Sequence, residues 1–253
     1  GTTIPGGTRT SFVSRSPLTG IWGEATVGGT WGAEFRCAGY DGLVIQGAAS
    51  SPVYLWINDD DVQIRPANQL WGKDTYDACD LLLVETDPKA KVAAIGQAGE
   101  NLVRIAAVMV EGRHARAAGR TGMGAVMGAK KLKAIVVRGT HGVPAYNPAG
   151  LMSWALRKTN EVPAKFGMFT VFGTSGSIET HEERGGLPIK NFQEGHWREG
   201  AARISGKTIQ EQYSVKSSSC SGCPIHCWQH VTIENGNGVR ENVGHNPEYE
   251  TLG

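Results

Sequence analysis

Residues 113–137 read RHARAAGRTGMGAVMGAKKLKAIVV, and two patterns in this stretch decide which fold the chain can adopt. The run Lys133 to Val137 is short, apolar and rich in β-branched residues, which predicts a strand. The glycines within residues 119–128 predict a bend that leads into this strand. Arginines lie among those glycines. Because guanidinium groups bind phosphate and glycine lets the backbone approach a ligand closely, the segment is also a candidate ligand cradle.

Patterns on the N-terminal side of this stretch predict a β-rich region up to about residue 140. An apolar strand over 52–57 is followed by the acidic run 58–61 and by the alternating residues 62–64, which is typical of a hairpin. The acidic run lacks the glycine and the distal glutamate of a calcium loop, so we interpret it as a solvated turn. Other short runs predict strands at 12–13, 92–95 and 102–110, and a buried apolar run at 42–45.

Helical patterns appear at two places. Asp74 is the predicted N-cap of a helix that reaches Glu85, and Pro148 is suited to the first turn of a helix that we expect to end at Arg157. Strand patterns give way to helical ones near the second of these. We therefore predict an α+β fold with two domains, a β-rich one over 1–145 and the start of a mostly helical one over 146–253.

The composition excludes several classes of protein. The 253 residues contain 25 Lys and Arg against 24 Asp and Glu, and a net charge of +1 argues against a protein that binds nucleic acid by charge. Apolar runs such as Ile105 to Val110 are far shorter than the roughly 20 residues of a membrane-spanning helix. The chain starts at Gly1 within a Thr/Gly stretch, and we expect it to be a piece of a longer protein.

Three of the five cysteines lie within eight residues. This is not the pattern of a disulfide framework, and we expect reduced thiols in a cytoplasmic protein. Cys220, Cys223 and Cys227 have the C-x2-C-x3-C spacing that brings thiolates onto one metal centre. A [4Fe-4S] cluster suits this spacing better than zinc, because no second C-x2-C pair follows. Unpaired core cysteines are the third interpretation.

The residues leave the fourth ligand of such a cluster open. Cys37 and Cys79 both lie in apolar surroundings that suit packing rather than metal binding. His226 is a further alternative, although we interpret it as a spacer between two cysteines. We expect the fourth thiolate to lie beyond Gly253.

A second segment that combines arginine with glycine runs from Arg9 to Gly29. Neither segment contains the G-x-G-x-x-G of dinucleotide-binding folds or the Walker G-x4-G-K-[ST] sequence. Taken alone, each is as well explained by tight turns. Together they predict a cradle for a phosphate-bearing cofactor.

Six strings along the chain resemble, in order and spacing, the tungsten-dependent aldehyde ferredoxin oxidoreductase family. They are SPLTG (16–20), AGYD (38–41), GENLVR (99–104), AGRTGMGAVMG (118–128), CxxCPIxC (220–227) and PEYET (247–251). The resemblance covers nearly the whole chain and implies an N-terminal domain of two β-sheets that binds a bis-pterin tungsten cofactor, tungstopterin. It implies that two mostly helical domains follow, that only the first of them begins in this chain, and that the fourth cluster cysteine comes from the other.

The resemblance also implies roles for single residues in binding the pterin. Arg9 matches an arginine near the pterin phosphate, and Gly28 matches a glycine that packs on the pterin. Thr26 stands where relatives often carry Asn, whose backbone carbonyl binds the Mg²⁺ that bridges the pterin phosphates; the carbonyl of Ala117 offers the other contact. The second pterin-binding segment matches Arg116, Ala117, Gly119 and Arg120.

The same resemblance implies how the protein would work. The cluster ligands match Cys220, Cys223 and Cys227, and Glu250 matches a carboxylate near the tungsten that handles protons, with Glu248 as the fallback. The implied reaction is the oxidation of an aldehyde to a carboxylic acid, with electrons passed through the cluster to ferredoxin. Molybdenum suits the same dithiolene ligation, and the implied assembly is a homo-oligomer or a complex with electron-transfer subunits.

Two alternatives to aldehyde oxidation stay open at this point. Within the family, the chain is also compatible with a reductase of aromatic acyl-thioester rings. Outside it, the three cysteines would suit a zinc-binding module without catalysis. In every case we expect neither nucleic acid nor a membrane as a partner.

Overall fold

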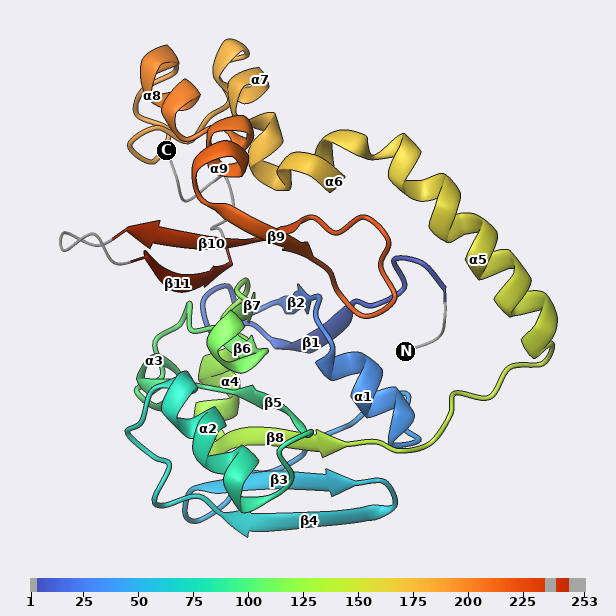
Figure 1. Ribbon diagram of the computed structural model, residues 1–253. Coiled ribbons are helices and arrows are strands. Elements are labelled where there is room, and N and C mark those ends of the chain that lie inside the picture. The colour runs from blue at the N-terminus through green and yellow to red at the C-terminus, as the bar shows by residue number, and fades with distance from the viewer. Residues whose placement is uncertain (1–3, 235–239, 246–253) are drawn as a thin grey trace. The chain divides into compact units, whose positions relative to one another are not determined.

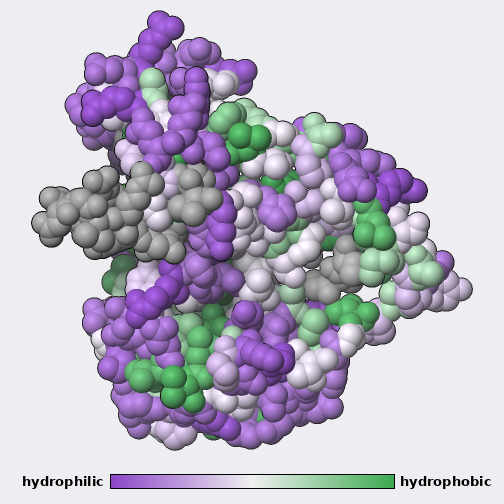
Figure 2. Space-filling view, in the orientation of Figure 1, coloured by the Kyte–Doolittle hydropathy of each residue, from purple (hydrophilic) through white to green (hydrophobic). Residues whose placement is uncertain are grey.

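The computed structural model describes residues 4–234 and 240–245, and the chain divides into two compact units, 1–151 and 152–253. Figure 1 shows strands in both and the longest helix at the start of the second. None of the helices in the described residues is both long and apolar enough to cross a membrane. Figure 2 shows polar side chains over much of the visible face, with apolar side chains gathered in small patches between them.

A mixed sheet forms the centre of the first unit. Within the described residues it has six strands in the order β4-β3-β8-β5-β6-β7, and only β3 and β8 run parallel. Its strands are β3 (Val53–Asn58), β4 (Asp61–Pro66), β5 (Lys91–Ala94), β6 (Val108–Val110), β7 (Arg116–Ala118) and β8 (Leu132–Arg138). A separate antiparallel hairpin of β1 (Thr10–Arg15) and β2 (Trp22–Val27) forms a second sheet.

Short helices accompany the two sheets of this unit. They are α1 (Trp31–Cys37), α2 (Thr75–Glu85), α3 (Gln97–Glu100), the 3-10 turn η1 (Gly112–His114) and α4 (Met123–Ala129). Strand β8 is buried on both faces, which explains its almost continuous apolar sequence. Ile135 and Val137 belong to a core that includes Trp31 of α1, whereas Ala134 and Val136 belong to a core that includes Leu82 of α2.

Several predicted elements are confirmed. β1 contains Phe12 and Val13, and β8 contains the run 133–137. β3 and β4 pair as a hairpin whose turn is the acidic run, with Asn58 opposite Asp61. Asp74 is the N-cap of α2, because its carboxylate accepts the backbone N–H groups of Tyr76 and Asp77 at 2.9 and 2.8 Å.

Two predictions for apolar runs are wrong. The run 42–45 is not buried, because Leu43 and Val44 are 42% and 83% exposed and only Ile45 is half-buried. Only the last part of the predicted strand 102–110 is one, β6. Residues 102–106 instead continue the turns that follow α3, with Val103 N–H bonded to the carbonyl of Ala98.

The bend predicted over 119–128 is also wrong in its second half, where α4 forms. Its glycines serve close packing rather than flexibility. A Cβ at Gly128 would lie 1.9 Å from the carbonyl oxygen of Gly99, and one at Gly124 would lie 2.3 Å from that of Ala107. The helix therefore lies directly against the backbone of 99–107, and this contact compensates for the low helix propensity of glycine.

The thiol of Cys79, on the buried side of α2, is expected to be inert. Burial raises its pKa to about 11, from an ordinary 9.0. At pH 9 about 1% of this thiol would be ionised in the folded protein, against half in the unfolded chain. Iodoacetamide at pH 9 should therefore leave Cys79 unmodified until urea is added, as measured by peptide mass spectrometry. Because folding raises the pKa of Cys79, the neutral thiol contributes to the free energy of unfolding. This contribution is complete below pH 9 and is lost as the pH rises toward 11. Rapid alkylation of the folded protein at Cys79 would contradict this burial.

The second unit combines helices with a three-stranded antiparallel sheet, as far as the described residues extend. Its helices are α5 (Pro148–Lys165), α6 (Gly167–Phe172), η2 (Thr174–Ser177), α7 (Ile178–Glu183), α8 (Arg198–Arg203) and α9 (Gly206–Gln212), and its strands are β9 (Ser214–Ser218), β10 (Trp228–Glu234) and β11 (Arg240–His245). Helix α5 begins at Pro148 as predicted, but it continues past Arg157 and through Pro163. The α+β fold class, with a β-rich first part followed by helices, is confirmed.

Candidate cofactor site

The two segments that combine arginine with glycine lie on neighbouring strands of the first unit. Among the described residues, β2 pairs with β1 alone, and β7, at the end of the large sheet, pairs with β6 alone. β2 and β7 contact each other without a hydrogen-bond ladder between them (Figure 1). Each strand thus has one edge outside any ladder in this part of the chain. The backbone N–H and C=O groups of such edges can bind a ligand.

The predicted residues of the first segment lie on β2 and directly after it. Thr26 is exposed on β2, opposite Ser11 of β1, and Gly28 is buried just beyond the strand. Gly29 is buried too, with a φ of +99°, and a Cβ there would lie 2.6 Å from Oε1 of Glu111. Glycine is therefore required at position 29 by the backbone conformation and by the lack of space.

The predicted residues of the second segment lie on β7 and after it. Arg116 is half-buried and Ala117 is exposed, opposite Met109 of β6, and both Gly119 and Arg120 are exposed. The structure therefore brings Thr26 and Ala117, the two proposed sources of backbone carbonyls, onto contacting strands.

Arg113, in the same segment, forms an ion pair with a carboxylate of α2. Its guanidinium donates to Oδ2 of Asp80 from Nη2 at 2.6 Å and from Nε at 3.1 Å, and it lies over the ring of Tyr76 at 6.0 Å. Both donors meet the same carboxylate oxygen, so the guanidinium of Arg113 faces α2.

The chain is in strained conformations on both sides of β7. Ala115 before the strand and Thr121 after it have φ values of +48° and +61°, which side-chain-bearing residues rarely adopt. Gly122 follows with a φ of +76°, and a Cβ there would lie 2.1 Å from the carbonyl oxygen of Arg104. Such strain costs about 1–3 kcal/mol per residue and gathers at ligand-binding sites. It supports a functional role for this edge.

The carboxylate of Glu111 links the two segments. Its Oε1 accepts the backbone N–H groups of Thr30 at 2.6 Å and Trp31 at 3.3 Å, and both of its oxygens accept the hydroxyl of Thr30, at 2.9 and 3.0 Å. Sequence reasoning missed this residue, because a single glutamate before Gly112 belongs to no spacing pattern.

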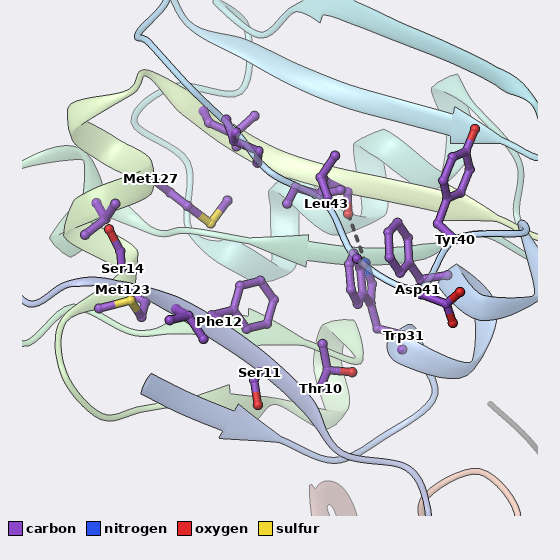
Figure 3. Close-up of a pocket in the computed structure, with 18 of the residues that line it drawn as sticks. Thr10, Ser11, Phe12, Ser14, Trp31, Tyr40, Asp41, Leu43, Met123 and Met127 are labelled. Carbon is purple, nitrogen blue, oxygen red and sulfur yellow. Dashed lines mark hydrogen bonds between the residues drawn. The ribbon is translucent and has the colours of Figure 1, made fainter. Parts of the chain in front are cut away.

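Arg9 directly precedes β1, where Thr10 pairs with Val27 of β2, and it also lines a groove of about 460 Å³ formed by β1, α1, α4, β8 and residues 40–45. Figure 3 shows Phe12 of β1, Trp31 of α1 and the methionines of α4 around it. Trp31 is held there by a hydrogen bond from its ring N–H to the carbonyl of Ile135, at 3.1 Å. Of the predicted cofactor-binding residues, Arg9 alone lines this groove.

The three clustered cysteines lie in the loop between β9 and β10 of the second unit. All three are half-buried and none is in a disulfide, and the N–H of Cys223 donates to the carbonyl of Cys220 at 3.0 Å, which closes a turn. Gly222 and His226 have φ values of +63° and +55°. The loop therefore changes direction twice within the motif.

The thiols of this loop are a donor set for a metal centre. Among the residues that the structure describes, no three His, Cys, Asp or Glu side chains are grouped so as to hold a single metal ion. Thiolates are ligands of both zinc and iron–sulfur clusters, and a cubane cluster binds each thiolate on a different iron.

The carboxylates proposed to handle protons, Glu250 and Glu248, lie outside the described residues, as does the string PEYET. Cys37, at the end of α1, and Cys79, in α2, lie in the first unit. The fourth cluster ligand is therefore still a prediction.

Taken together, these features define an α+β protein with an arginine- and glycine-rich edge in one unit and a three-cysteine loop in the other. The family model "Aldehyde ferredoxin oxidoreductase, N-terminal domain" matches residues 1–139, and "Aldehyde ferredoxin oxidoreductase, domains 2 & 3" matches residues 150–253. The chain belongs to the aldehyde ferredoxin oxidoreductase family, which confirms the resemblance seen in the sequence.

Individual relatives agree with this assignment. The chain is 40% identical over 256 residues to the "Tungsten-containing aldehyde ferredoxin oxidoreductase" of Pyrococcus furiosus, covering 100% of this chain and 41% of the relative. The chain is also 33% identical to the "Aliphatic sulfonate oxidoreductase, WOR-like subunit" of the same organism. That alignment covers 96% of this chain and 41% of the relative. The chain thus spans about 41% of the length of these relatives.

A solved structure has a similar fold. It is described as "Active site complex BamBC of Benzoyl Coenzyme A reductase in complex with 1,5 Dienoyl-CoA". It superposes with a TM-score of 0.75 at 29% sequence identity, over 95% of this chain and 39% of that one.

Proposed function

We propose that the protein oxidises aldehydes to carboxylic acids at a tungstopterin centre, to which this chain contributes the pterin-binding edge and three ligands of a [4Fe-4S] cluster. The overall reaction converts an aldehyde and water into the acid, two protons and two electrons. Ferredoxin, or another carrier of single electrons, would take the electrons one at a time.

The observation that carries this proposal is the contact between β2 and β7, each of which has one edge outside any ladder in the described residues. Gly28 directly follows β2, and Arg116 and Arg120, from a distant part of the sequence, lie on β7 and just after it. An edge of this kind suits a ligand with phosphate groups and a flat ring. The 40% identity to the tungsten-containing relative supports the same cofactor.

In this proposal each residue keeps a defined role. Arg9, Arg116 and Arg120 would bind pterin phosphates through their guanidinium groups, and Gly28 and Gly119 would let the pterin approach the backbone. The carbonyls of Thr26 and Ala117 would bind the Mg²⁺ between the phosphates, since carbonyl oxygens are ligands that Mg²⁺ accepts. The cluster would be held by Cys220, Cys223 and Cys227, with a fourth thiolate from elsewhere in the protein.

The cofactors would supply the redox chemistry, with tungsten taking the electron pair and the cluster passing single electrons onward. The chain's own residues would position the cofactor and neutralise the charge of its phosphates. The guanidinium groups would compensate the charge of the phosphates. Glu250 would accept a proton released as the aldehyde is hydrated and oxidised, and Glu248 is its alternative.

A second candidate is the reduction of an aromatic acyl-thioester ring. It is favoured by one observation, the superposition on the BamBC complex over 95% of this chain. The higher identity to the aldehyde-oxidising relatives, 40% against 29%, puts aldehyde oxidation first.

The test uses the intact protein, purified without oxygen and assayed with a one-electron viologen dye. We expect dye reduction that depends on an added aldehyde and yields the matching acid in a ratio of one acid to two reduced dyes. Dye oxidation that depends on an aromatic acyl-thioester would favour the second candidate. Colourless protein that contains zinc and lacks iron and tungsten would contradict both and leave a zinc-binding module.

The remaining proposals concern the setting of the reaction. We propose the cytoplasm as the compartment, because the spacing of the five cysteines is not that of a disulfide framework and none of them is in a disulfide. One relative is described as a subunit, which supports assembly with electron-transfer subunits or with further copies of the chain. Molybdenum in place of tungsten would suit the same residues.

A further inference from the structure

We propose that Glu111 is a positioning residue that sets the spacing between the two halves of the cofactor cradle, an inference that rests on the proposed function. The residue directly follows β6, and its side chain crosses to the loop after β2. It belongs to neither segment that the sequence marks out.

The contact is a carboxylate clamp on one threonine. Glu111 receives the N–H and the hydroxyl of Thr30, with the N–H of Trp31 as a third donor. Hydrogen bonds to an ionised carboxylate are about twice as strong as those between neutral groups. Gly29 has no side chain, and this absence is what allows the carboxylate to come so close.

The clamp joins the segments where they bind the cofactor in the proposed function. Thr30 comes two residues after Gly28, and Glu111 comes five residues before Arg116. No hydrogen-bond ladder joins β2 to β7 in the described part of the chain, and the Glu111 side chain links the loop after β2 to the end of β6, the strand paired with β7. A cradle that binds one rigid ligand from both edges needs their separation fixed to within about 0.5 Å.

Glu111 itself has a φ of +70°, in the left-handed region that glutamate rarely adopts. The hydrogen bonds to Thr30 compensate for this strain, since a different backbone conformation at Glu111 would move the carboxylate away from Thr30. The strained residues 111, 115 and 121 surround β7 and together fix the course of the second segment.

The same fold contains a matched clamp far from the cradle. Asp59, with a φ of +50°, accepts the N–H and the hydroxyl of Thr140 at 2.7 and 2.6 Å, and this pair is also 81 residues apart in sequence. Hydrogen bonds from Thr140 lower the pKa of Asp59, so the carboxyl is ionised at neutral pH. Asp59 lies in the β3–β4 turn, at the opposite side of the sheet from β7.

This pair of clamps gives the experiment its control. The intact protein and the variants Glu111→Ala, Glu111→Gln and Asp59→Ala are purified without oxygen, and tungsten and released pterin are quantified per chain. Amide hydrogen exchange at Thr30 and Trp31 is measured in the same samples. Glu111→Gln keeps an oxygen that accepts both N–H groups but removes the charge.

We expect Glu111→Ala to lower the tungsten and pterin content about tenfold or more, as for other residues that orient ligands of a metal centre, and to speed exchange at Thr30 and Trp31. Asp59→Ala should keep the content of the unmodified protein, and Glu111→Gln should restore most of it. Equal losses in Glu111→Ala and Asp59→Ala, unchanged content in Glu111→Ala, or failure of Glu111→Gln to restore it would each overturn the proposal. An unmodified protein without tungsten and pterin would instead contradict the proposed function itself.

Discussion

Replacing Lys133 by methionine is expected to lower the free energy of unfolding by about 3–5 kcal/mol, because it leaves a buried carboxylate without its partner. Lys133 lies in the central strand β8 with no exposed side-chain surface. Its Nζ donates to Oε1 of Glu100 and, at 2.8 Å, to the carbonyl of Lys73. The other oxygen of Glu100 accepts the N–H of Gly72 at 2.8 Å. The ion pair therefore fastens the turn before α2 and the end of α3 to the middle of the sheet.

Urea unfolding followed by tryptophan fluorescence measures this effect, since Trp31 and Trp56 are buried in the same unit. The double variant Lys133→Met with Glu100→Gln should recover much of the loss, because the amide oxygen still accepts the N–H of Gly72 and no charge stays buried. Lys131→Met, at an exposed lysine two residues earlier, is the control and should change stability by about 0.5 kcal/mol or less. A cost of less than about 1 kcal/mol for Lys133→Met would be incompatible with a buried pair.

Replacing Cys223 by serine is expected to remove the iron from the anaerobically purified protein. Cys223 is the middle thiol of the loop, and its N–H closes the turn with Cys220. Serine keeps the backbone N–H that closes this turn, but its hydroxyl is a poor ligand for iron in place of the thiolate. Brown absorption near 400 nm, expected for an iron–sulfur cluster, should disappear, and iron per chain should fall on the order of tenfold.

The matched control for this experiment is Cys37→Ser, which changes a half-buried thiol at the end of α1. It should leave both the absorption and the iron content unchanged. Retention of iron and colour in Cys223→Ser would show that the loop does not hold the cluster, and loss of both in Cys37→Ser would assign a ligand in the first unit instead.

Local patterns predicted the elements whose stability is local. The hairpin of β3 and β4 follows from alternation around an acidic turn, and α2 follows from its N-cap at Asp74. The strand β8 was predicted from its continuous apolar run, and the run is continuous because both faces of the strand are buried. The glycines of α4 misled the same reasoning. Their low helix propensity predicts a bend, whereas their contact with the backbone of Gly99 and Ala107 selects a helix.

The residue types of the candidate site could be predicted from the sequence, but the contacts that assemble it could not. The spacing of the cysteines, and the arginines among glycines, indicated cofactors from the sequence alone. The contact between β2 and β7, and the clamp from Glu111 to Thr30, join positions about eighty or more residues apart. No periodicity within one sequence carries such long-range pairs. The groove that Arg9 lines is formed in the same way by residues far apart in the sequence.

The central claim is that the unladdered edges of β2 and β7 hold a phosphorylated tungsten cofactor. Anomalous diffraction at the tungsten absorption edge, from crystals of the intact protein grown without oxygen, tests it most directly. The account predicts a tungsten peak beside these two strands, with pterin density that touches Thr26, Gly28 and residues 116–120. A tungsten peak away from both strands, or another strand of the protein paired along both edges, would contradict it.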